Sequence, residues 1–321
     1  MPVFGRHSTA EEVARSVSLR GLTVVLTGAS SGIGEETARA LALTGATVIL
    51  GVRDVAKGEA VARTLGPHVR IAELDLANLS SVIAFADGIE GPVDRLICNA
   101  GVSKTPASHL PNGLDIRFAT NHLGHFLLAH RLHPRMANRH ARIVMLSSAA
   151  HKGCPVRLDD LQWTERAHRD GMAYAESKSA NILFAQEASR RWAADGITTN
   201  AILPGSALTG LQRHHGEALK RRIGFIREDG SIDPMVKSTA QAAATTLWAT
   251  TAPELEGRGG LVLEDCAEAL PVGPETHAWS GYDTAIADPR TAAGLWDISL
   301  GLIRRLAGDH ALADRGGEGP A

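Results

Sequence analysis

Residues 27–34 read TGASSGIG and stand between a short apolar run and an amphipathic stretch. The run before them, LTVVLT at 22–27, is β-branched and bounded by glycine, which predicts a buried strand. The stretch at 34–45 has apolar residues at helical spacing and ends in glycine, which predicts a helix. A glycine-rich turn between strand and helix lets backbone approach a ligand and presents free N–H groups, so it predicts a nucleotide pyrophosphate site. The candidate cofactor contacts in this turn are Gly28, Ser30, Ser31, Gly32, Ile33 and Gly34.

The same alternation of strand and helix continues along most of the chain. Further strands are predicted at 46–52, 68–75, 93–101, 141–148, 197–205 and 259–264, and further helices at 54–66, 78–89, 113–137, 172–193 and 238–251. Strands separated by helices of about a dozen residues form βαβ units. The sequence therefore predicts an α/β fold: a doubly wound (Rossmann) seven-stranded parallel sheet with helices on both faces.

No linker rich in Pro, Gly or Ser divides the 321 residues, so one large domain is predicted rather than two. We expect an N-terminal helical extension at 1–20, a single Rossmann-fold domain at 21–310 and a disordered tail at 311–321. The string STAEE at 8–12 indicates a helix capping box within the extension. The irregular, polar segment at about 206–235 is expected to be a lid over the substrate.

Composition excludes several classes of function. The formal net charge of −2 argues against nucleic acid as a partner, and no stretch approaches the ~20 apolar residues of a membrane span. Three widely spaced cysteines do not suggest disulfides, so a cytoplasmic location is expected. His122 and His125 lie three apart, but no third ligand is apparent at suitable spacing, so no metal site is expected.

The end of the second predicted strand bears on the choice between NAD(H) and NADP(H). The strand ends LGVRD, so Arg53 arrives first and Asp54 opens the next helix. An acidic residue here would bind the ribose 2′-OH, whereas the planar fork of an arginine can pair with a 2′-phosphate. Arg53 could also be a solvated surface charge, with Asp54 as a helix N-cap. We expect NADP(H) to be favoured over NAD(H), with Ser30 as a further phosphate contact.

Tyr174 and Lys178 lie four apart in YAESK, on one face of a predicted helix. A free phenol has a pKa of about 10, and a nearby ammonium favours the phenolate and brings the group towards neutral pH. Tyr174 could then give a proton to a carbonyl oxygen that accepts hydride. A hydroxyl from Ser147 or Ser148, at the end of the fifth strand, could hold that oxygen.

Together these motifs resemble the short-chain dehydrogenase/reductase superfamily over roughly residues 20–265. TGASSGIG, LDL, CNAG, TNHLG, YAESK and PGSALT each match a family segment, although Cys98 stands where the family has asparagine. The resemblance implies that Asn121 bends a helix and holds a relay water, Ser148 is the catalytic serine, Tyr174 the acid/base and Lys178 its partner and ribose ligand. It implies further cofactor contacts at Asp75, Leu76, Asn99, Ala100, Gly101, Pro204, Gly205 and Thr209.

The wide gap between Ser148 and Tyr174, together with NHLGHFLL and SSAAH, is similar to the branch of retinol dehydrogenases, WW-domain oxidoreductases and protochlorophyllide reductases. This implies an NADP(H)-dependent ketoreductase or alcohol dehydrogenase that acts on a small molecule. The segment at about 206–235 mixes apolar residues with charges, which fits a lid over an apolar substrate, so we expect the substrate to be bulky and lipophilic, as a polycyclic secondary metabolite would be. A steroid- or retinoid-like alcohol or aldehyde is one alternative, and a non-catalytic NADP(H)-binding sensor or scaffold is another. A homo-oligomer, dimer or tetramer, stays open, as do the roles of His151, His214 and His215.

Overall fold

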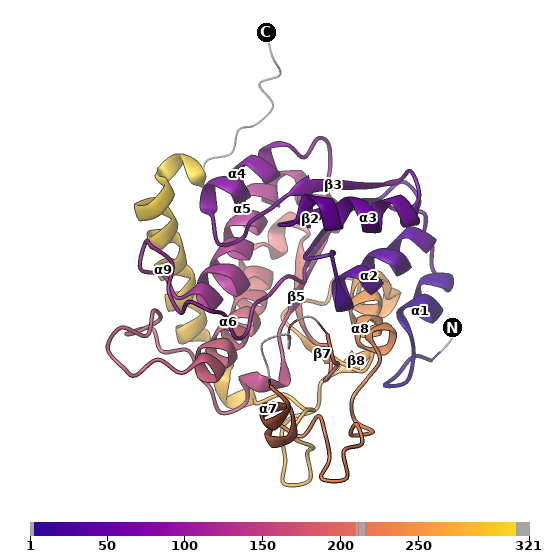
Figure 1. Cartoon of the computed structure of the whole chain (residues 1–321). Helices are drawn as coiled ribbons and strands as arrows, with labels where there is room; N and C mark the ends of the chain where they lie inside the picture. Colours follow the sequence, from indigo (N-terminus) through magenta and orange to yellow (C-terminus); the bar gives the residue numbers. More distant parts are fainter. Residues whose placement is uncertain (1–2, 210, 212–215, 313–321) are drawn as a thin grey trace.

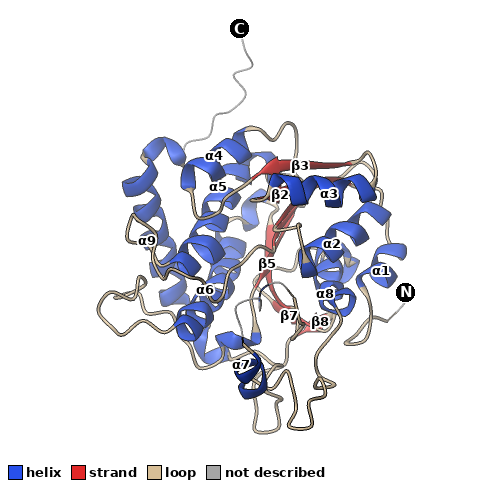
Figure 2. Cartoon of the chain, viewed as in Figure 1, coloured by secondary structure: helices blue, strands red, loops and turns tan. Residues whose placement is uncertain are grey.

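The computed structural model describes residues 3–209, 211 and 216–312, which form an eight-stranded sheet between two layers of helices (Figures 1 and 2). The strand order is β3-β2-β1-β4-β5-β6-β7-β8. All pairs from β3 to β7 are parallel, which confirms the doubly wound topology. The strands are β1 Thr23–Thr27, β2 Thr47–Val52, β3 Val69–Glu73, β4 Arg95–Cys98, β5 Arg142–Leu146, β6 Thr198–Leu203, β7 Val262–Glu264 and β8 Ala267–Glu268.

Each face of the sheet buries its own apolar cluster under helices. One cluster lies beneath α1, α2, α3 and α8, and the other beneath α4, α5, α6 and α9. The first four helices are Ala10–Arg15, Gly32–Leu43, Val55–Leu65 and Thr239–Thr251. The second four are Leu79–Asp87, Gly124–Met136, Asp170–Arg191 and Pro289–Ala307. The strands are therefore covered on both sides, as their nearly continuous apolar runs require.

The predicted count of seven strands is wrong by one, because β8 adds an antiparallel pair to β7. The two strands are joined by Asp265 and Cys266, which have φ angles of 50° and 58°. Two consecutive residues with positive φ make a tight hairpin turn that reverses the chain. Neither residue is a glycine, so the sequence carries no obvious signal for this turn.

The helix predicted at 113–137 begins later than expected and is not uniformly α-helical. Asp115 accepts hydrogen bonds from the backbone N–H groups of Arg117 and Phe118, which fixes the start of the helix. The first turn, Phe118–Leu123, is π-helical, and α5 follows it directly. Asn121 lies inside this turn, at the place where the resemblance implies a bend.

The two ends of the described chain both pack on the fold. Thr9 caps α1 and forms the predicted capping box with Glu12. Sequence analysis did not predict α9, although Asp288 caps it and it carries an apolar stripe that includes Trp296, whose ring stacks on Phe184. Ala311 is fully buried, so the ordered fold extends past the predicted boundary of the tail, and residues 313–321 lie outside the described residues.

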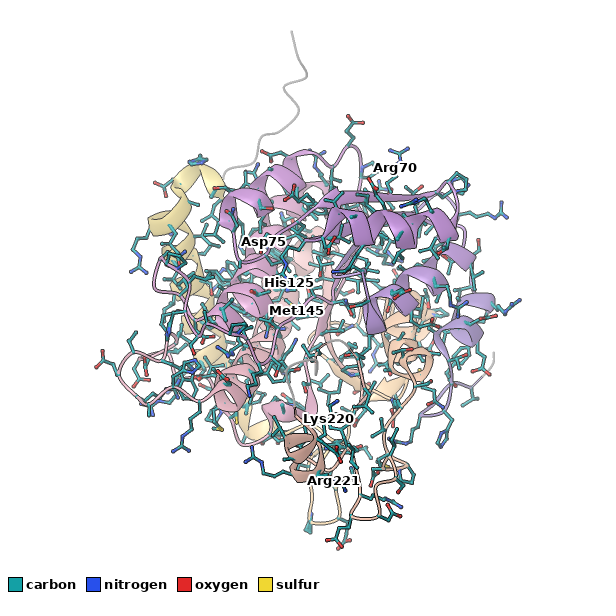
Figure 3. All side chains as sticks on the ribbon, viewed as in Figure 1. Arg70, Asp75, His125, Met145, Lys220 and Arg221 are labelled. Atoms are coloured by element: carbon teal, nitrogen blue, oxygen red, sulfur yellow. The ribbon has the colours of Figure 1, made fainter. Side chains whose placement is uncertain are left out.

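Among its described residues, the segment predicted as an irregular lid contains the short helix α7 (Glu217–Arg222), where Lys220 and Arg221 lie (Figure 3). Beyond it, an isolated bridge between Ile226 and Ile232 closes a small hairpin. His214 and His215 fall outside the described residues. Among the helices that the structure describes, none is long and apolar enough to cross a membrane.

Candidate active site

The glycine-rich turn follows β1 and packs so tightly that side chains would not fit. Gly28 has a φ of +73°, and a Cβ there would lie 2.7 Å from the Cα of Ala100. A Cβ on Gly34 would collide with the carbonyl oxygen of Gly28 and lie 2.5 Å from Asn99 Nδ2. The turn is therefore a backbone cradle at the N-terminus of α2, which fits a pyrophosphate group.

The rest of this turn lies at the surface or against the segment after β6. Ser31 is the exposed N-cap residue of α2 and makes no capping hydrogen bond with its side chain. Ser30 and Ile33 are partly buried. A Cβ on Gly32, whose φ is +61°, would lie 3.0 Å from the Cβ of Thr209. The structure thus brings Thr209, far away in the sequence, against the glycine-rich turn.

Thr27 joins the end of β1 to the segment that follows β4. Its hydroxyl accepts hydrogen bonds from the backbone N–H groups of Asn99 and Ala100, both at 3.0 Å, and lies 2.8 Å from His125 Nε2. His125 Nδ1 lies 3.0 Å from the carbonyl oxygen of Asn121, which can only accept, so Nε2 accepts from Thr27. Burial lowers the pKa of His125 to about 4, which keeps this tautomer neutral. Sequence analysis did not assign His125 this role.

Lys178 and Asn121 meet beside Gly101, the last residue of CNAG. A Cβ on Gly101 would lie 3.4 Å from Lys178 Nζ and 3.3 Å from Asn121 Oδ1. The Asn121 side chain is fully buried and bonds both backbone groups of Val102, at 2.7 and 2.9 Å, while its amide also donates to Ser177. Asn121 therefore fastens the segment after β4 to α6.

The buried Lys178 ammonium donates to the carbonyl oxygen of Leu146 at 3.0 Å. Burial lowers its pKa from 10.5 to about 8. Its Nζ lies 5.8 Å from the centre of the Tyr174 ring. Burial also raises the pKa of Tyr174, and a hydrogen bond with Ser148 lowers it in part. The expected downward shift of the tyrosine pKa is therefore not present here, because the loss of solvation outweighs the neighbouring groups.

The two serines that directly follow β5 have different bonding partners. Ser147 is buried, and its hydroxyl donates to the carbonyl oxygen of Lys178 at 2.8 Å. Ser148 is half-buried, caps the short helix that follows and shares the hydrogen bond with Tyr174. Of the two candidates, Ser148 is thus the one beside the phenol, whereas Ser147 fixes α6 to β5.

Arg53 and Asp54, which follow β2, differ in their bonding partners. The Asp54 carboxylate caps α3 by accepting from the Lys57 backbone at 3.1 Å, and it pairs with the Lys57 ammonium. These bonds lower the pKa of Asp54. Arg53 is exposed and, within the described part of the chain, its side chain makes no hydrogen bond or ion pair. The guanidinium group of Arg53 is therefore available to a ligand, whereas the Asp54 carboxylate is engaged as the N-cap of α3.

Four further predicted contacts lie in two pairs, after β3 and after β6. Asp75, labelled in Figure 3, accepts from the backbone N–H of Ala77 at 3.0 Å. The buried Leu76 packs its backbone on the start of α5. After β6, Pro204 is buried and Gly205 has a φ of +82°.

Lys237 is a residue that sequence analysis missed. A Cβ on Gly205 would lie 2.9 Å from Lys237 Cε, and the Lys237 backbone N–H donates to Ser206 at 2.7 Å. Its ammonium is buried and pairs with Asp265. Of the chain's lysines, only Lys178 and Lys237 are buried. A lone lysine in an irregular segment gave no signal for this position.

His122 and His151 are held by other groups of the protein. His122 Nε2 lies 3.0 Å from the hydroxyl of Ser299 on α9. His151 is fully buried and bonds backbone groups on both ring nitrogens. Among the described residues, no group of three or more His, Cys, Asp or Glu side chains could hold a metal ion.

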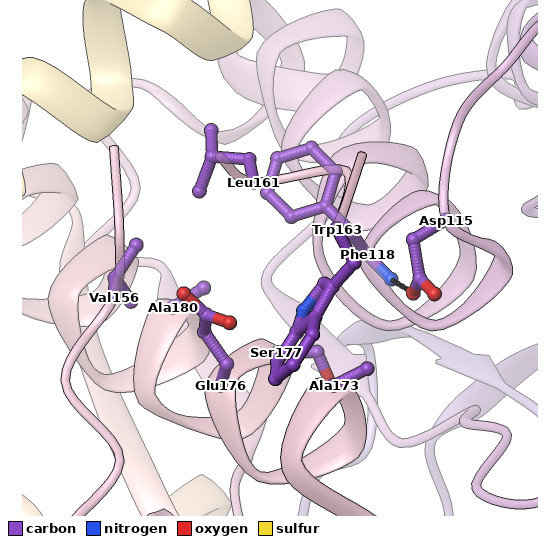
Figure 4. A pocket seen from close by; sticks show the side chains of 9 residues that line it. All are labelled: Asp115, Phe118, Val156, Leu161, Trp163, Ala173, Glu176, Ser177 and Ala180. Atoms are coloured by element: carbon purple, nitrogen blue, oxygen red, sulfur yellow. Dashed lines mark hydrogen bonds between the residues drawn. The ribbon is translucent and has the colours of Figure 1, made fainter. Parts of the chain in front are cut away.

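A small cavity borders α6 beside Ala173, Glu176 and Ser177 (Figure 4). Its volume is about 10 Å³, which is room for about one water molecule. It is lined by Asp115, Phe118, Val156, Leu161, Trp163, Ala173, Glu176, Ser177 and Ala180. Because it is too small for an organic substrate, the candidate site stays at the carboxyl ends of β1, β4 and β5.

A family model described as short chain dehydrogenase matches residues 22–220. A protein named "Probable oxidoreductase" from Streptomyces antibioticus is 40% identical over 235 residues, covering 72% of this chain and 78% of that protein. Retinol dehydrogenase 13 of Homo sapiens is 38% identical over 299 residues, and the alignment covers 89% of this chain and 86% of the human protein.

Two solved structures are similar over most of the chain. A protein from Mycobacterium paratuberculosis aligns with a TM-score of 0.71 and 36% identity, covering 91% of this chain and 97% of that one. A structure described as an NAD(P)-dependent gluconate 5-dehydrogenase from Beutenbergia cavernae, with NADP bound, aligns with a TM-score of 0.62 and 25% identity, covering 78% and 97%.

Proposed function

The chain belongs to the short chain dehydrogenase family, in the branch of the retinol dehydrogenases, and we propose that it reduces a bulky lipophilic ketone with NADP(H). Membership makes it an NAD(P)-dependent enzyme that interconverts an alcohol and a carbonyl. The cofactor preference, the substrate class and the roles of individual residues are our proposal. The meeting of Tyr174, Ser148, Lys178 and Asn121 at the carboxyl edge of the sheet carries it.

The nicotinamide cofactor, when bound, supplies or accepts the hydride. The Gly28–Gly34 cradle fits its pyrophosphate, because the turn lies at the N-terminus of α2 and a Cβ on Gly28 or Gly34 would collide with backbone. Asn99, Ala100 and Gly101 line the next strand end, and Thr209 lies against Gly32. We assign Asp75 and Leu76 to the adenine side, and Pro204 and Gly205 to the nicotinamide side.

In this mechanism the Tyr174 hydroxyl gives its proton to the substrate oxygen during reduction and takes it back during oxidation. Ser148, which already shares a hydrogen bond with Tyr174, holds the same oxygen. Lys178, as a cation, stabilises the phenolate that remains and contacts the ribose. Asn121 holds the backbone beside Lys178, and in our proposal it also holds the water through which a proton passes between solvent and Lys178.

The direct test is Tyr174→Phe, which removes the proton but keeps the ring. We expect turnover of any ketone to fall at least 100-fold, while NADPH binding, followed by cofactor fluorescence, changes less than 3-fold. Wild-type turnover in this variant would reject the assignment.

The adjacent serines give a matched pair of variants. Ser148→Ala should lower kcat by about 10²–10³-fold because it removes a donor to the substrate oxygen. Ser147→Ala removes only a bond to the Lys178 carbonyl and should cost far less. Equal losses would show that Ser148 acts structurally.

The preference for NADP(H) rests on Arg53. A charge-assisted contact contributes about 1.5–3 kcal/mol, so Arg53→Ala should weaken NADPH binding by roughly 10–100-fold and leave NADH nearly unchanged. Arg70, exposed on the neighbouring strand β3, offers the control, because Arg70→Ala also removes one positive charge (Figure 3). Equal losses for both cofactors, or for both variants, would refute the role.

The lipophilic substrate is supported by apolar side chains around the proposed lid. Met172, two residues before Tyr174, is 42% exposed, and Ile232 is 57% exposed. One relative is named for retinol, a lipophilic alcohol. We expect kcat/KM for a fused bicyclic ketone to exceed that for acetone by at least 100-fold, and the reverse order would reject this class.

The proposal places the enzyme in the cytoplasm, with a small molecule rather than nucleic acid as its partner. All three cysteines are free and buried, which suits a reducing compartment. Whether the chain forms a dimer or a tetramer is best measured by light scattering of the purified protein.

A further inference from the structure

Residues 269–283, here called the C-terminal strap, cross the carboxyl ends of the last parallel strands. The strap begins where Ala269 donates to the carbonyl oxygen of Val262 on β7. It returns where Tyr282 donates to Leu270 and accepts from Val272, both through backbone groups. The backbone N–H of Gly281 donates to the buried Glu264 carboxylate at the end of β7, at 2.8 Å. In doubly wound sheets, ligands bind outside these carboxyl ends.

The strap is fastened to the segment that follows Ser148. Lys152 Nζ donates to two strap carbonyl oxygens, those of His277 at 3.1 Å and Ser280 at 2.8 Å. The backbone N–H of Gly153 donates to the Asp283 carboxylate at 2.8 Å. Three consecutive residues, His151 to Gly153, thus hold the end of the strap.

His151 links Ser148 to the strap through its ring. Its Nδ1 lies 2.6 Å from the Ser148 carbonyl oxygen, and its Nε2 lies 3.0 Å from the Asp283 backbone N–H. A carbonyl can only accept and an amide N–H can only donate, so the ring is the neutral Nδ1–H tautomer. The ring is fully buried, and burial lowers its pKa. One imidazole therefore sets the distance between the serine loop and the strap.

The other side of the strap rests on the lid segment. Trp279 packs its ring 5.2 Å from the buried ring of Phe225. A Cβ on Gly224 would lie only 3.1 Å from the Trp279 ring. The strap therefore bridges the serine loop after β5 and the segment after β6, which enclose the carboxyl edge from two sides.

We propose that the C-terminal strap forms the wall of the substrate site that selects bulky lipophilic substrates. In this proposal Trp279 faces the substrate, and His151 positions the wall relative to Ser148. This inference rests on the proposed function, because it takes Ser148 as the residue that holds the substrate oxygen. A wall tied to Ser148 fixes how far a substrate can extend beyond its carbonyl. The apolar body of the substrate would then contact Trp279 and Phe225.

The wall is tested with Trp279→Ala and the matched variant Leu270→Ala, whose side chain is 77% exposed on the same strap. Trp279→Ala should raise KM for a fused bicyclic ketone about 10-fold or more and leave KM for acetone within 2-fold. Leu270→Ala should change neither. A uniform change for both ketones, or equal effects of both variants, would overturn the wall.

His151 is tested by two variants that each keep half of its bonding. His151→Asn keeps a donor near the Nδ1 position but cannot accept from Asp283, so KM for the bicyclic ketone should rise about 10-fold at nearly constant kcat. His151→Gln reaches the Asp283 N–H as an acceptor but loses the donor to Ser148, so kcat should fall and KM should hold. A purely structural role would move both parameters alike in both variants, which would overturn the positioning.

Hydrogen exchange separates failure of this inference from failure of the proposed function. In His151→Asn, the amide of Asp283 and those of strap residues 279–282 should exchange at least 10-fold faster, whether or not any ketone is turned over. Unchanged exchange would refute the link through His151. Accelerated exchange together with full activity of Tyr174→Phe would instead refute the proposed chemistry and retain the link.

Discussion

Gly34→Ala is the substitution whose consequence follows most directly from the structure. The new Cβ would overlap the carbonyl oxygen of Gly28 and lie 2.5 Å from Asn99 Nδ2. Ordinary contacts need about 3.5 Å, so α2 or the segment after β4 must move by roughly 1 Å. Asn99 Nδ2 also donates to Thr27 and Gly28, at 2.8 and 3.1 Å, and that movement would strain both bonds.

The cost can be worked from these contacts. Overpacking costs about 1–3 kcal/mol, and a clash with backbone lies at the upper end because no side chain can rotate away. A loss of about 3 kcal/mol should lower Tm by about 4–5 °C for a chain of this size. Displacement of the cradle should also weaken NADPH binding at least 10-fold.

The assay is differential scanning fluorimetry with and without NADPH, next to a titration of cofactor fluorescence. Gly301→Ala is the control, because Gly301 is exposed in α9 with nothing within 4 Å of an added Cβ, and it should gain about 0.5–1 kcal/mol. If Gly34→Ala matched the wild type in Tm and in NADPH affinity, the cradle argument would be refuted.

Two further predictions concern buried groups. The pKa of Lys178 in the folded protein, about 8, lies below its ordinary value of 10.5. Below pH 8 the buried charge therefore lowers the stability of the cofactor-free protein by about 3 kcal/mol. This loss of stability becomes smaller as the pH rises from 8 towards 10.5. Lys178→Met should therefore be more stable than wild type at pH 7 but not at pH 10.5 in urea unfolding, and equal stability at pH 7 would contradict the burial argument. The Ser299 hydroxyl donates to the carbonyl oxygen of Leu295 and so accepts from Nε2–H of His122. Ser299→Ala should leave this buried N–H without a partner and lower the free energy of unfolding by about 1–3 kcal/mol in the same assay. A loss below about 0.5 kcal/mol would contradict this tautomer of His122.

Local sequence patterns predicted most of the sheet. The strands from β1 to β7 fall within the predicted ranges, because short β-branched runs bounded by glycine have few other folds available. Asp54 also caps the helix that it was predicted to open, since its side chain bonds a backbone group three residues away. Contacts between residues this close in the chain can be predicted from the local sequence.

Long-range partners could not be predicted in the same way. Lys237 lies behind Gly205, and His125 accepts from Thr27 across 98 positions, yet neither spacing suggests a pair. The π-helical turn contains Asn121, whose side chain bonds both backbone groups of Val102, 19 positions earlier. In each case the partner comes from a distant part of the chain, so the contact is set by the tertiary fold.

The sequence by itself determined the alternation of strands β1 to β7 with helices, the glycine cradle and the pairing of Tyr174 with Lys178. These depend on backbone freedom, apolar periodicity and residue chemistry, all of which act over a few positions. Only the tertiary structure decided which of Ser147 and Ser148 adjoins Tyr174, which tautomers His125 and His151 hold, and that the strap reaches the serine loop. Those outcomes depend on burial and on donors brought together from distant parts of the chain, and a linear sequence does not record such distances.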